Sequence, residues 1–144
     1  YGKKWTSFKG NLFVSIFFKI NKVQLSLKDL TKVNCLLVKK LLSKFYNGKI
    51  TIKKPNDLLI NRMKISGILQ EILTKSGEKF IVVGVGINLT KSPIIKNYLT
   101  TNLFDLTGTK ITPNYAALRL KKIYEIFIPM FPKFNIKNLD RNLK

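Results

Sequence analysis

The chain has 144 residues, the size of one ordinary domain, and its 45% hydrophobic and 24% charged residues are a globular balance. It contains no histidine and one cysteine, Cys35, which excludes Ser-His-Asp triads, Cys-His pairs, histidine zinc sites and an internal disulfide. Its net charge of +20 raises the prior for nucleic-acid binding.

The type of basic residue argues against a protein that reads nucleic-acid sequence. The 27 basic residues include only three arginines, Arg62, Arg119 and Arg141. A lysine cannot replace the bidentate arginine fork that such proteins use. Because the lysines are also spread along the whole chain, we interpret the charge as a solvated surface combined with A/T-rich coding. A basic nucleic-acid-binding domain is kept as an alternative.

Sequence features also bear on the compartment. No apolar run reaches the roughly 18 residues that cross a bilayer, because Lys19 interrupts the longest one. We therefore expect no membrane partner, and the lone cysteine favours a reducing, cytoplasmic compartment. The chain begins at Tyr1 without a leader-like segment, so we expect it to be a fragment.

The first half of the chain predicts a strand followed by a helix. Asn11–Ile20 is rich in β-branched and aromatic residues, which is typical of a buried strand. Ser26 and Asp29 form a capping pattern that opens a helix to about Tyr46. Gly48 suits the left-handed position that ends such a helix.

Turn residues divide the next segment into strands. Asn61-Arg62 and Ser76-Gly77-Glu78 are the two hairpin turns. The strands that we expect are Lys49–Lys53, Leu58–Ile60, Lys64–Leu73 and Lys79–Leu89.

The second half predicts a short helix in the loop 92–110 and a longer helix that starts at Thr112-Pro113 and ends by Pro129. No repeat or linker divides the chain. We therefore expect one α+β domain over residues 1–144, with a mixed, mostly antiparallel sheet and helices packed on one face.

One strand has a bare face. Gly84, Gly86 and Asn88 alternate with apolar residues, so they share one side of the strand. Two alternating glycines indicate that another group lies close to the backbone of this strand. A flat ligand and a tightly packed helix explain this pattern equally well.

Two further segments carry candidate polar groups. Asn56 and Asp57 form a turn after Pro55, where a carboxylate can bind a divalent cation or a ribose hydroxyl; a plain turn is the alternative. Lys64 precedes an apolar strand that contains Gly67, and a solvated lysine is the alternative there.

In this order and spacing, the segments resemble the biotin–protein ligase family. The family's Lys-Trp-Pro-Asn-Asp, Lys-x-x-Gly-Ile-Leu-x-Glu and Gly-x-Gly-Ile-Asn motifs correspond to residues 53–57, 64–71 and 84–88. Tyr1-Gly2-Lys3-Lys4-Trp5, followed by Gly10-Asn11-Leu12, is similar to the end of the family's arginine-glycine loop and its next strand. Lys54 and Lys3 depart from the usual Trp and Arg. The motifs cover residues 1 to about 90.

The resemblance implies the fold of the class II aminoacyl-tRNA synthetase and biotin ligase core. It also implies an enzyme that uses ATP and Mg²⁺ to convert biotin to biotinyl-5'-AMP. The biotinyl group is then transferred to a lysine of a biotin carboxyl carrier protein. We expect the start of the arginine-glycine loop to lie before Tyr1, and we see no C-terminal barrel. An inactive remnant is therefore an alternative for the isolated chain, and the resemblance also allows a homodimer.

The resemblance assigns roles to individual residues. Lys64 is the catalytic candidate. The residues implied in biotin binding are Gly2, Lys3, Lys64, Gly67, Gly84 and Gly86. Those implied in nucleotide binding are Trp5, Asn56, Asp57 and Asn88, with Asp57 also a candidate for Mg²⁺; for Trp5, core packing is an equal alternative. A lipoate or octanoate ligase is the nearest alternative function.

Overall fold

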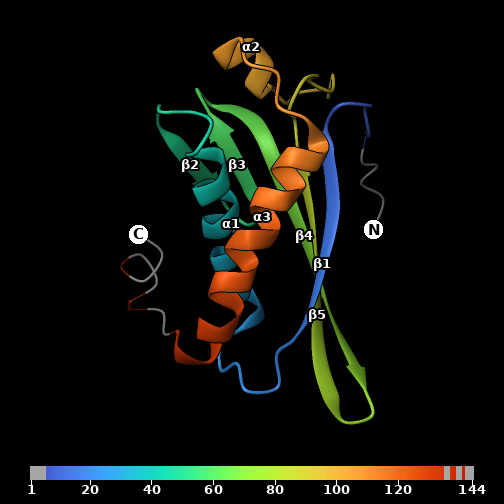
Figure 1. The fold of residues 1–144 in the computed structure, drawn as a ribbon, viewed down its shortest axis with the longest axis vertical. Coiled ribbons are helices and arrows are strands. Elements are labelled where there is room, and N and C mark those ends of the chain that lie inside the picture. Colours follow the sequence, from blue (N-terminus) through green and yellow to red (C-terminus); the bar gives the residue numbers. More distant parts are fainter. Residues whose placement is uncertain (1–5, 135–136, 139–140, 142–144) are drawn as a thin grey trace.

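Five strands form one sheet, and two long helices cover one of its faces (Figure 1). The computed structural model describes residues 6–134, 137–138 and 141. The elements are β1 (Leu12–Lys19), α1 (Leu27–Leu42), β2 (Ile50–Lys53), β3 (Asp57–Ile60), β4 (Met63–Lys75), β5 (Glu78–Ile87), α2 (Leu103–Thr107), α3 (Pro113–Phe127) and the 3-10 helix η1 (Ile128–Lys133).

The strand order is β1-β5-β4-β3-β2, and every neighbouring pair is antiparallel. One isolated parallel bridge joins Lys64 to Thr100. The predicted α+β fold, with a mostly antiparallel sheet and helices on one face, is therefore confirmed. In the described part of the chain, no helix has the length and apolarity required to span a membrane.

Both predicted hairpin turns are present. Asn61 and Arg62 have φ angles of 50° and 65°, and Ser76 and Gly77 have φ angles of 51° and 75°. Two successive residues at positive φ match the right-handed twist of the flanking strands and allow a two-residue connection. These turns place β3, β4 and β5 side by side.

The end of α1 differs from our prediction. Ser26 caps the start as expected, but the helix ends at Leu42 and not near Tyr46. Backbone N–H groups of Phe45 and Tyr46 both donate to the Leu42 carbonyl, so a tight turn satisfies the helix end. Gly48 is not among the positive-φ glycines of the described residues and has no left-handed role.

The end of α3 lies close to our prediction. Thr112 and Pro113 begin the helix as predicted, and its α-helical part ends at Phe127, before Pro129. The chain continues as η1, which contains both Pro129 and Pro132. Proline lacks the N–H that would continue the i→i−4 bonding of an α-helix, so the α-helical part ends before Pro129.

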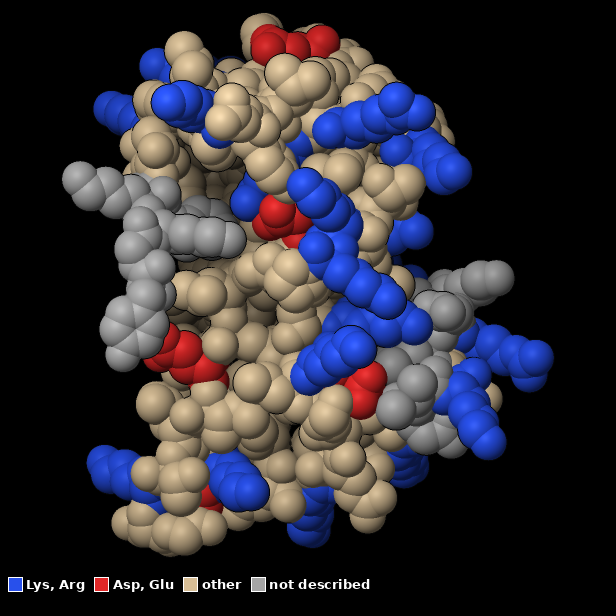
Figure 2. All heavy atoms as spheres, turned by 180° about the vertical axis from the view of Figure 1, so that it is seen from behind, with Lys and Arg blue, Asp and Glu red and all other residues tan. Residues whose placement is uncertain are grey.

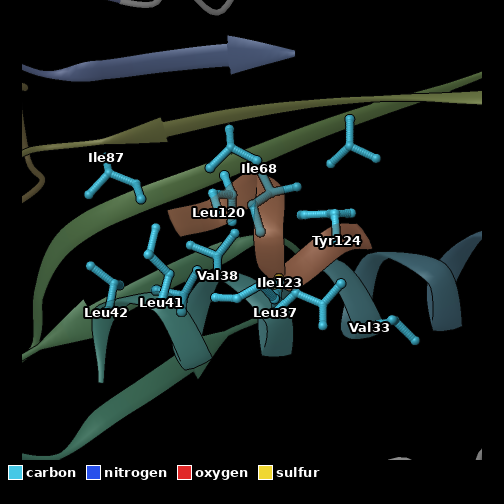
Figure 3. Packing of buried hydrophobic residues seen from close by; sticks show 14 of the residues in the cluster. Val33, Leu37, Val38, Leu41, Leu42, Ile68, Ile87, Leu120, Ile123 and Tyr124 are labelled. Atoms are coloured by element: carbon cyan, nitrogen blue, oxygen red, sulfur yellow. The ribbon is translucent and has the colours of Figure 1, made fainter. Parts of the chain in front are cut away.

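The core lies between the helices and the sheet (Figure 3). Leu41 from α1, Leu120 from α3 and Ile68 from β4 are each at most 1% exposed and point into this layer. The spacing of apolar residues explains why these side chains point into the core. Helical positions three and four apart share a face, and so do alternate strand positions. Among the described residues, no long helix covers the opposite face of the sheet, which we call the open face (Figure 1).

A buried chain of polar side chains crosses the core. The Tyr124 hydroxyl of α3 donates to Asn34 Oδ1 of α1 at 2.8 Å, and Asn34 Nδ2 donates to Gln70 Oε1 of β4 at 2.7 Å. Burial raises the pKa of the Tyr124 hydroxyl, which therefore stays a donor. These two hydrogen bonds fix the position of both helices on the sheet.

We predict that Tyr124→Phe lowers the free energy of unfolding by about 1–3 kcal/mol, because it leaves the Asn34 oxygen buried without this donor. Urea unfolding measures the change. Tyr115→Phe, on the exposed side of the same helix, is the matched control and should cost under about 0.5 kcal/mol. Equal costs for the two variants would contradict the role of the buried chain.

Candidate functional site

A row of small and charged residues crosses the open face of the sheet. The strand registers align Phe13, Gly86, Gly67, Asp57 and Lys53 as successive neighbours on β1, β5, β4, β3 and β2. Neighbours in register lie on the same face. The middle of the row has no side chains, and its β2 end is charged.

A β-bulge brings Lys64 to the same face. Leu58 pairs with Ser66, but Leu59 pairs with Lys64, so Ile65 is an extra residue on β4. Strict alternation would place Lys64 and Gly67 on opposite faces, because they are three residues apart. The extra residue reverses this, as bulges do when they redirect a side chain.

The redirected lysine meets Asp57. Lys64 Nζ lies 2.7 Å from Asp57 Oδ1, and the two side chains are 25% and 18% exposed. Such a partly buried pair keeps more of its attraction than a surface pair does. The structure therefore joins the catalytic candidate and the candidate metal or ribose ligand in one ion pair.

Tyr98, which our sequence reasoning did not identify, holds the other carboxylate oxygen. Its hydroxyl donates to Asp57 Oδ2 at 2.7 Å. Desolvation, followed by the hydrogen bond to Asp57 and the charge of that carboxylate, raises the pKa of the Tyr98 hydroxyl to about 12. The hydroxyl is therefore protonated at neutral pH. Nothing in the local sequence distinguishes Tyr98 from a loop residue without a role in the site.

Asn88 and Asn11 hold the end of β5. Asn88 Nδ2 donates to the Thr101 carbonyl at 3.0 Å and to the Lys64 carbonyl at 3.4 Å. Asn11 Oδ1 accepts from the backbone N–H groups of residues 89, 90 and 91 at 3.0–3.1 Å. These contacts give both asparagines structural roles beside Lys64. The expected nucleotide contact of Asn88 stays a prediction.

Asn56 is bonded to β4. Its Nδ2 donates to the Ile68 carbonyl at 2.6 Å, and the N–H of Ile68 donates to the Asn56 carbonyl at 2.9 Å. This pair of bonds fixes the segment that leads into Asp57. The expected nucleotide contact of Asn56 stays a prediction.

Gly84 distinguishes the two explanations of the bare strand face. It lies on the side away from the helices, since its neighbours Val83 and Val85 face the core. A Cβ built there would meet only Leu69 atoms at 3.5 and 4.0 Å among the described residues, which is ordinary contact. Helix packing therefore does not require this glycine, and close approach of a ligand stays a prediction.

Three predicted site residues, Gly2, Lys3 and Trp5, lie outside the described residues. Within the described ranges, no group of three or more His, Cys, Asp or Glu side chains could hold a metal ion. Cys35 is buried in α1, and desolvation, ahead of the charge of Asp57, raises its pKa to about 12. Its thiol is therefore not a nucleophile at neutral pH.

The surface around the site is basic. Seen from the face that the helices leave open, lysine and arginine side chains gather toward the β2 side (Figure 2). Lys53 and Lys54, at the end of β2, are both exposed. The site is thus set to receive anionic groups.

Known proteins share this sequence and fold. The chain is 36% identical over 127 residues to the bifunctional ligase/repressor BirA of Escherichia coli and 30% identical over 127 residues to that of Salmonella typhimurium. Each alignment covers 87% of this chain and 40% of the relative, so the chain spans less than half the length of these relatives. The biotin protein ligase from Aquifex aeolicus in complex with biotin and ATP superposes with a TM-score of 0.81 at 26% identity, covering 99% of this chain and 60% of that one.

The family model described as the biotin/lipoate A/B protein ligase family matches residues 1–88. This range contains the Asp57–Lys64 pair and the glycine strand. The resemblance to biotin–protein ligases is confirmed, and the chain belongs to the biotin/lipoate A/B protein ligase family.

Proposed function

We propose that this protein is a biotin–protein ligase that activates biotin with ATP and transfers the biotinyl group to a lysine of a biotin carboxyl carrier protein. The observation that carries the proposal is the Lys64–Asp57 pair beside the bare glycine backbone on the open face of the sheet. The Aquifex aeolicus structure, a biotin protein ligase by name, and the Mycobacterium tuberculosis relative, named biotin--[acetyl-CoA-carboxylase] ligase, support the choice of biotin.

Lys64 addresses the main electrostatic problem of the first step. A biotin carboxylate oxygen attacks the α-phosphorus of ATP, and the bond from that phosphorus to pyrophosphate breaks. Two anions must meet, so a fixed cation at that point lowers the barrier. Lys64 supplies this charge, and its ion pair with Asp57 fixes the amine before substrate binds.

The remaining residues divide between the two substrates. We assign the flat rings and the chain of biotin to the backbone at Gly67, Gly84 and Gly86, which have no side chains. Asn56, Asp57 and Asn88 are assigned to the nucleotide. Gly2, Lys3 and Trp5, from the loop before β1, complete the assignment by resemblance.

Mg²⁺ is part of the proposal. This cation commonly uses one or two carboxylates and the substrate phosphates, so the single carboxylate of Asp57 fits a magnesium ion that arrives with ATP. The ion would neutralise phosphate charge. Asp57 would then exchange one of its present contacts with Lys64 or Tyr98 for the metal.

The second step needs orientation more than acid–base catalysis. The carrier lysine attacks the acyl carbon of the mixed anhydride, an amide forms, and AMP leaves. Because AMP is a good leaving group, positioning of the amine is sufficient. We also propose a cytoplasmic location, where ATP is present and the single Cys35 stays reduced. A homodimer stays a prediction that sedimentation analysis can test.

A lipoate or octanoate ligase is the competing proposal, because the matched family includes both activities in its name. The Pro55-Asn56-Asp57 and Gly84–Asn88 motifs and the relatives that are named biotin ligases favour biotin. A nucleic-acid-binding domain explains the net charge of +20 but not the Lys64–Asp57 pair.

We predict that the protein, expressed from its intact reading frame, catalyses ATP–pyrophosphate exchange that depends on biotin. Lipoate is the control acid. Exchange with biotin alone supports the proposal, whereas exchange with lipoate alone would assign the protein to the sibling activity. A folded protein without exchange, which instead binds nucleic acid with a steep salt dependence, would refute both ligase proposals.

We predict that Lys64→Ala lowers the turnover of this exchange by about a hundredfold or more, because a preorganised charge at the phosphate is lost. Lys75→Ala is the matched control: Lys75 lies on the same strand, is exposed, and pairs with Glu78 at the far end of the hairpin. Thermal unfolding of both variants checks stability. Wild-type turnover in Lys64→Ala would show that the proposed mechanism is wrong.

A further inference from the structure

Tyr98 lies in the segment between β5 and α2, beyond the residues 1–88 that the family model matches. Its hydroxyl and the Lys64 amine hold different oxygens of Asp57, each at 2.7 Å. A carboxylate bonded at both oxygens by two different elements cannot rotate freely. The orientation of Asp57 therefore depends on Tyr98 as well as on Lys64.

The ring of Tyr98 also contacts lysine amines. Lys53 Nζ lies 4.4 Å from the ring centroid, and Lys64 Nζ lies 5.6 Å from it. Both distances are within the range in which a cation is attracted to an aromatic face. One side chain thus contacts the carboxylate and two of the cations that face the site.

The residues after Tyr98 hold the backbone of Lys64. The Lys64 N–H donates to the Leu99 carbonyl at 2.8 Å, and the Thr101 N–H donates to the Lys64 carbonyl at 2.9 Å. This segment takes up pairing with β4 where β5 has ended. Residues 98–101 therefore position Lys64 in two ways. They bond its main chain, and Tyr98 holds Asp57, the ion-pair partner of its amine.

Building on the proposed ligase function, we infer that Tyr98 is a positioning residue for biotin activation, acting through Asp57 on Lys64. When the α-phosphate arrives, the Lys64 amine must turn from Asp57 toward it. The carboxylate that loses this cation keeps a charge-assisted hydrogen bond from the Tyr98 hydroxyl. Tyr98 thus makes it easier for the Lys64 amine to leave Asp57 and move to the reacting phosphate. It also fixes the position from which the amine moves.

The first test compares Tyr98→Phe with wild type in biotin-dependent ATP–pyrophosphate exchange. The phenylalanine keeps the ring and removes only the hydroxyl. We expect kcat to fall about tenfold, the loss typical of one hydrogen bond to a charged group, with KM for biotin changed less than about twofold. Tyr115→Phe is the control; it removes a hydroxyl exposed on α3 and should leave kcat unchanged.

The second test repeats the change in an Asp57→Asn background. If Tyr98 acts through Asp57, Tyr98→Phe should lower kcat there by less than about twofold, because coupled residues are not additive. Equal losses in both backgrounds would overturn the inference, as would full turnover in Tyr98→Phe. A loss that follows only the folded fraction, measured by thermal unfolding, also overturns it. Absence of biotin-dependent exchange in wild type refutes the ligase proposal itself, and this inference with it.

Discussion

The ion pair between Lys64 and Asp57 depends on one extra residue in β4. Without the bulge at Ile65, the lysine would face the helices and the carboxylate would face the open side. The bulge is itself held in place, since the Ile65 carbonyl accepts the N–H of Asn88 at 2.9 Å. The side chain of Asn88 also donates to the Thr101 carbonyl, next to the segment that pairs with Lys64. The end of β5 and the segment after it therefore maintain the local geometry on which the proposed chemistry depends.

The two faces of the sheet have different roles: one packs against the helices, and the other carries the candidate site. One face, with α1 and α3, contains the apolar core and the buried Tyr124–Asn34–Gln70 hydrogen bonds, which fix the layers. The other face has bare backbone and charge in the row from Gly86 to Lys53. Because the strands are continuous across both faces, rigid packing on one side preorganises the groups on the other. Such preorganisation is what electrostatic stabilisation of a reacting phosphate requires.

Local signals predicted most of the fold, and longer-range contacts explain what was missed. The cap at Ser26 and the turn at Asn61 act through neighbouring residues, so their effects are visible in the sequence. The closing turn of α1 before Gly48 follows from backbone bonds that several sequences could form. The bulge at Ile65 and the contact of Tyr98 with Asp57 join segments up to 41 residues apart, and no periodicity encodes them. The sequence thus supplied candidate site residues, apart from Tyr98, but not how they meet.

In the proposed mechanism, biotin is activated as an acyl adenylate on this face of the sheet. The most direct measurement uses biotin labelled with ¹⁸O in both carboxylate oxygens, together with ATP, Mg²⁺ and hydroxylamine as the acceptor. Attack on the acyl carbon leaves the bridging oxygen on the phosphate, so the proposed mechanism yields AMP that carries one ¹⁸O atom, which mass spectrometry detects. Unlabelled AMP, or ADP in place of AMP, would contradict it.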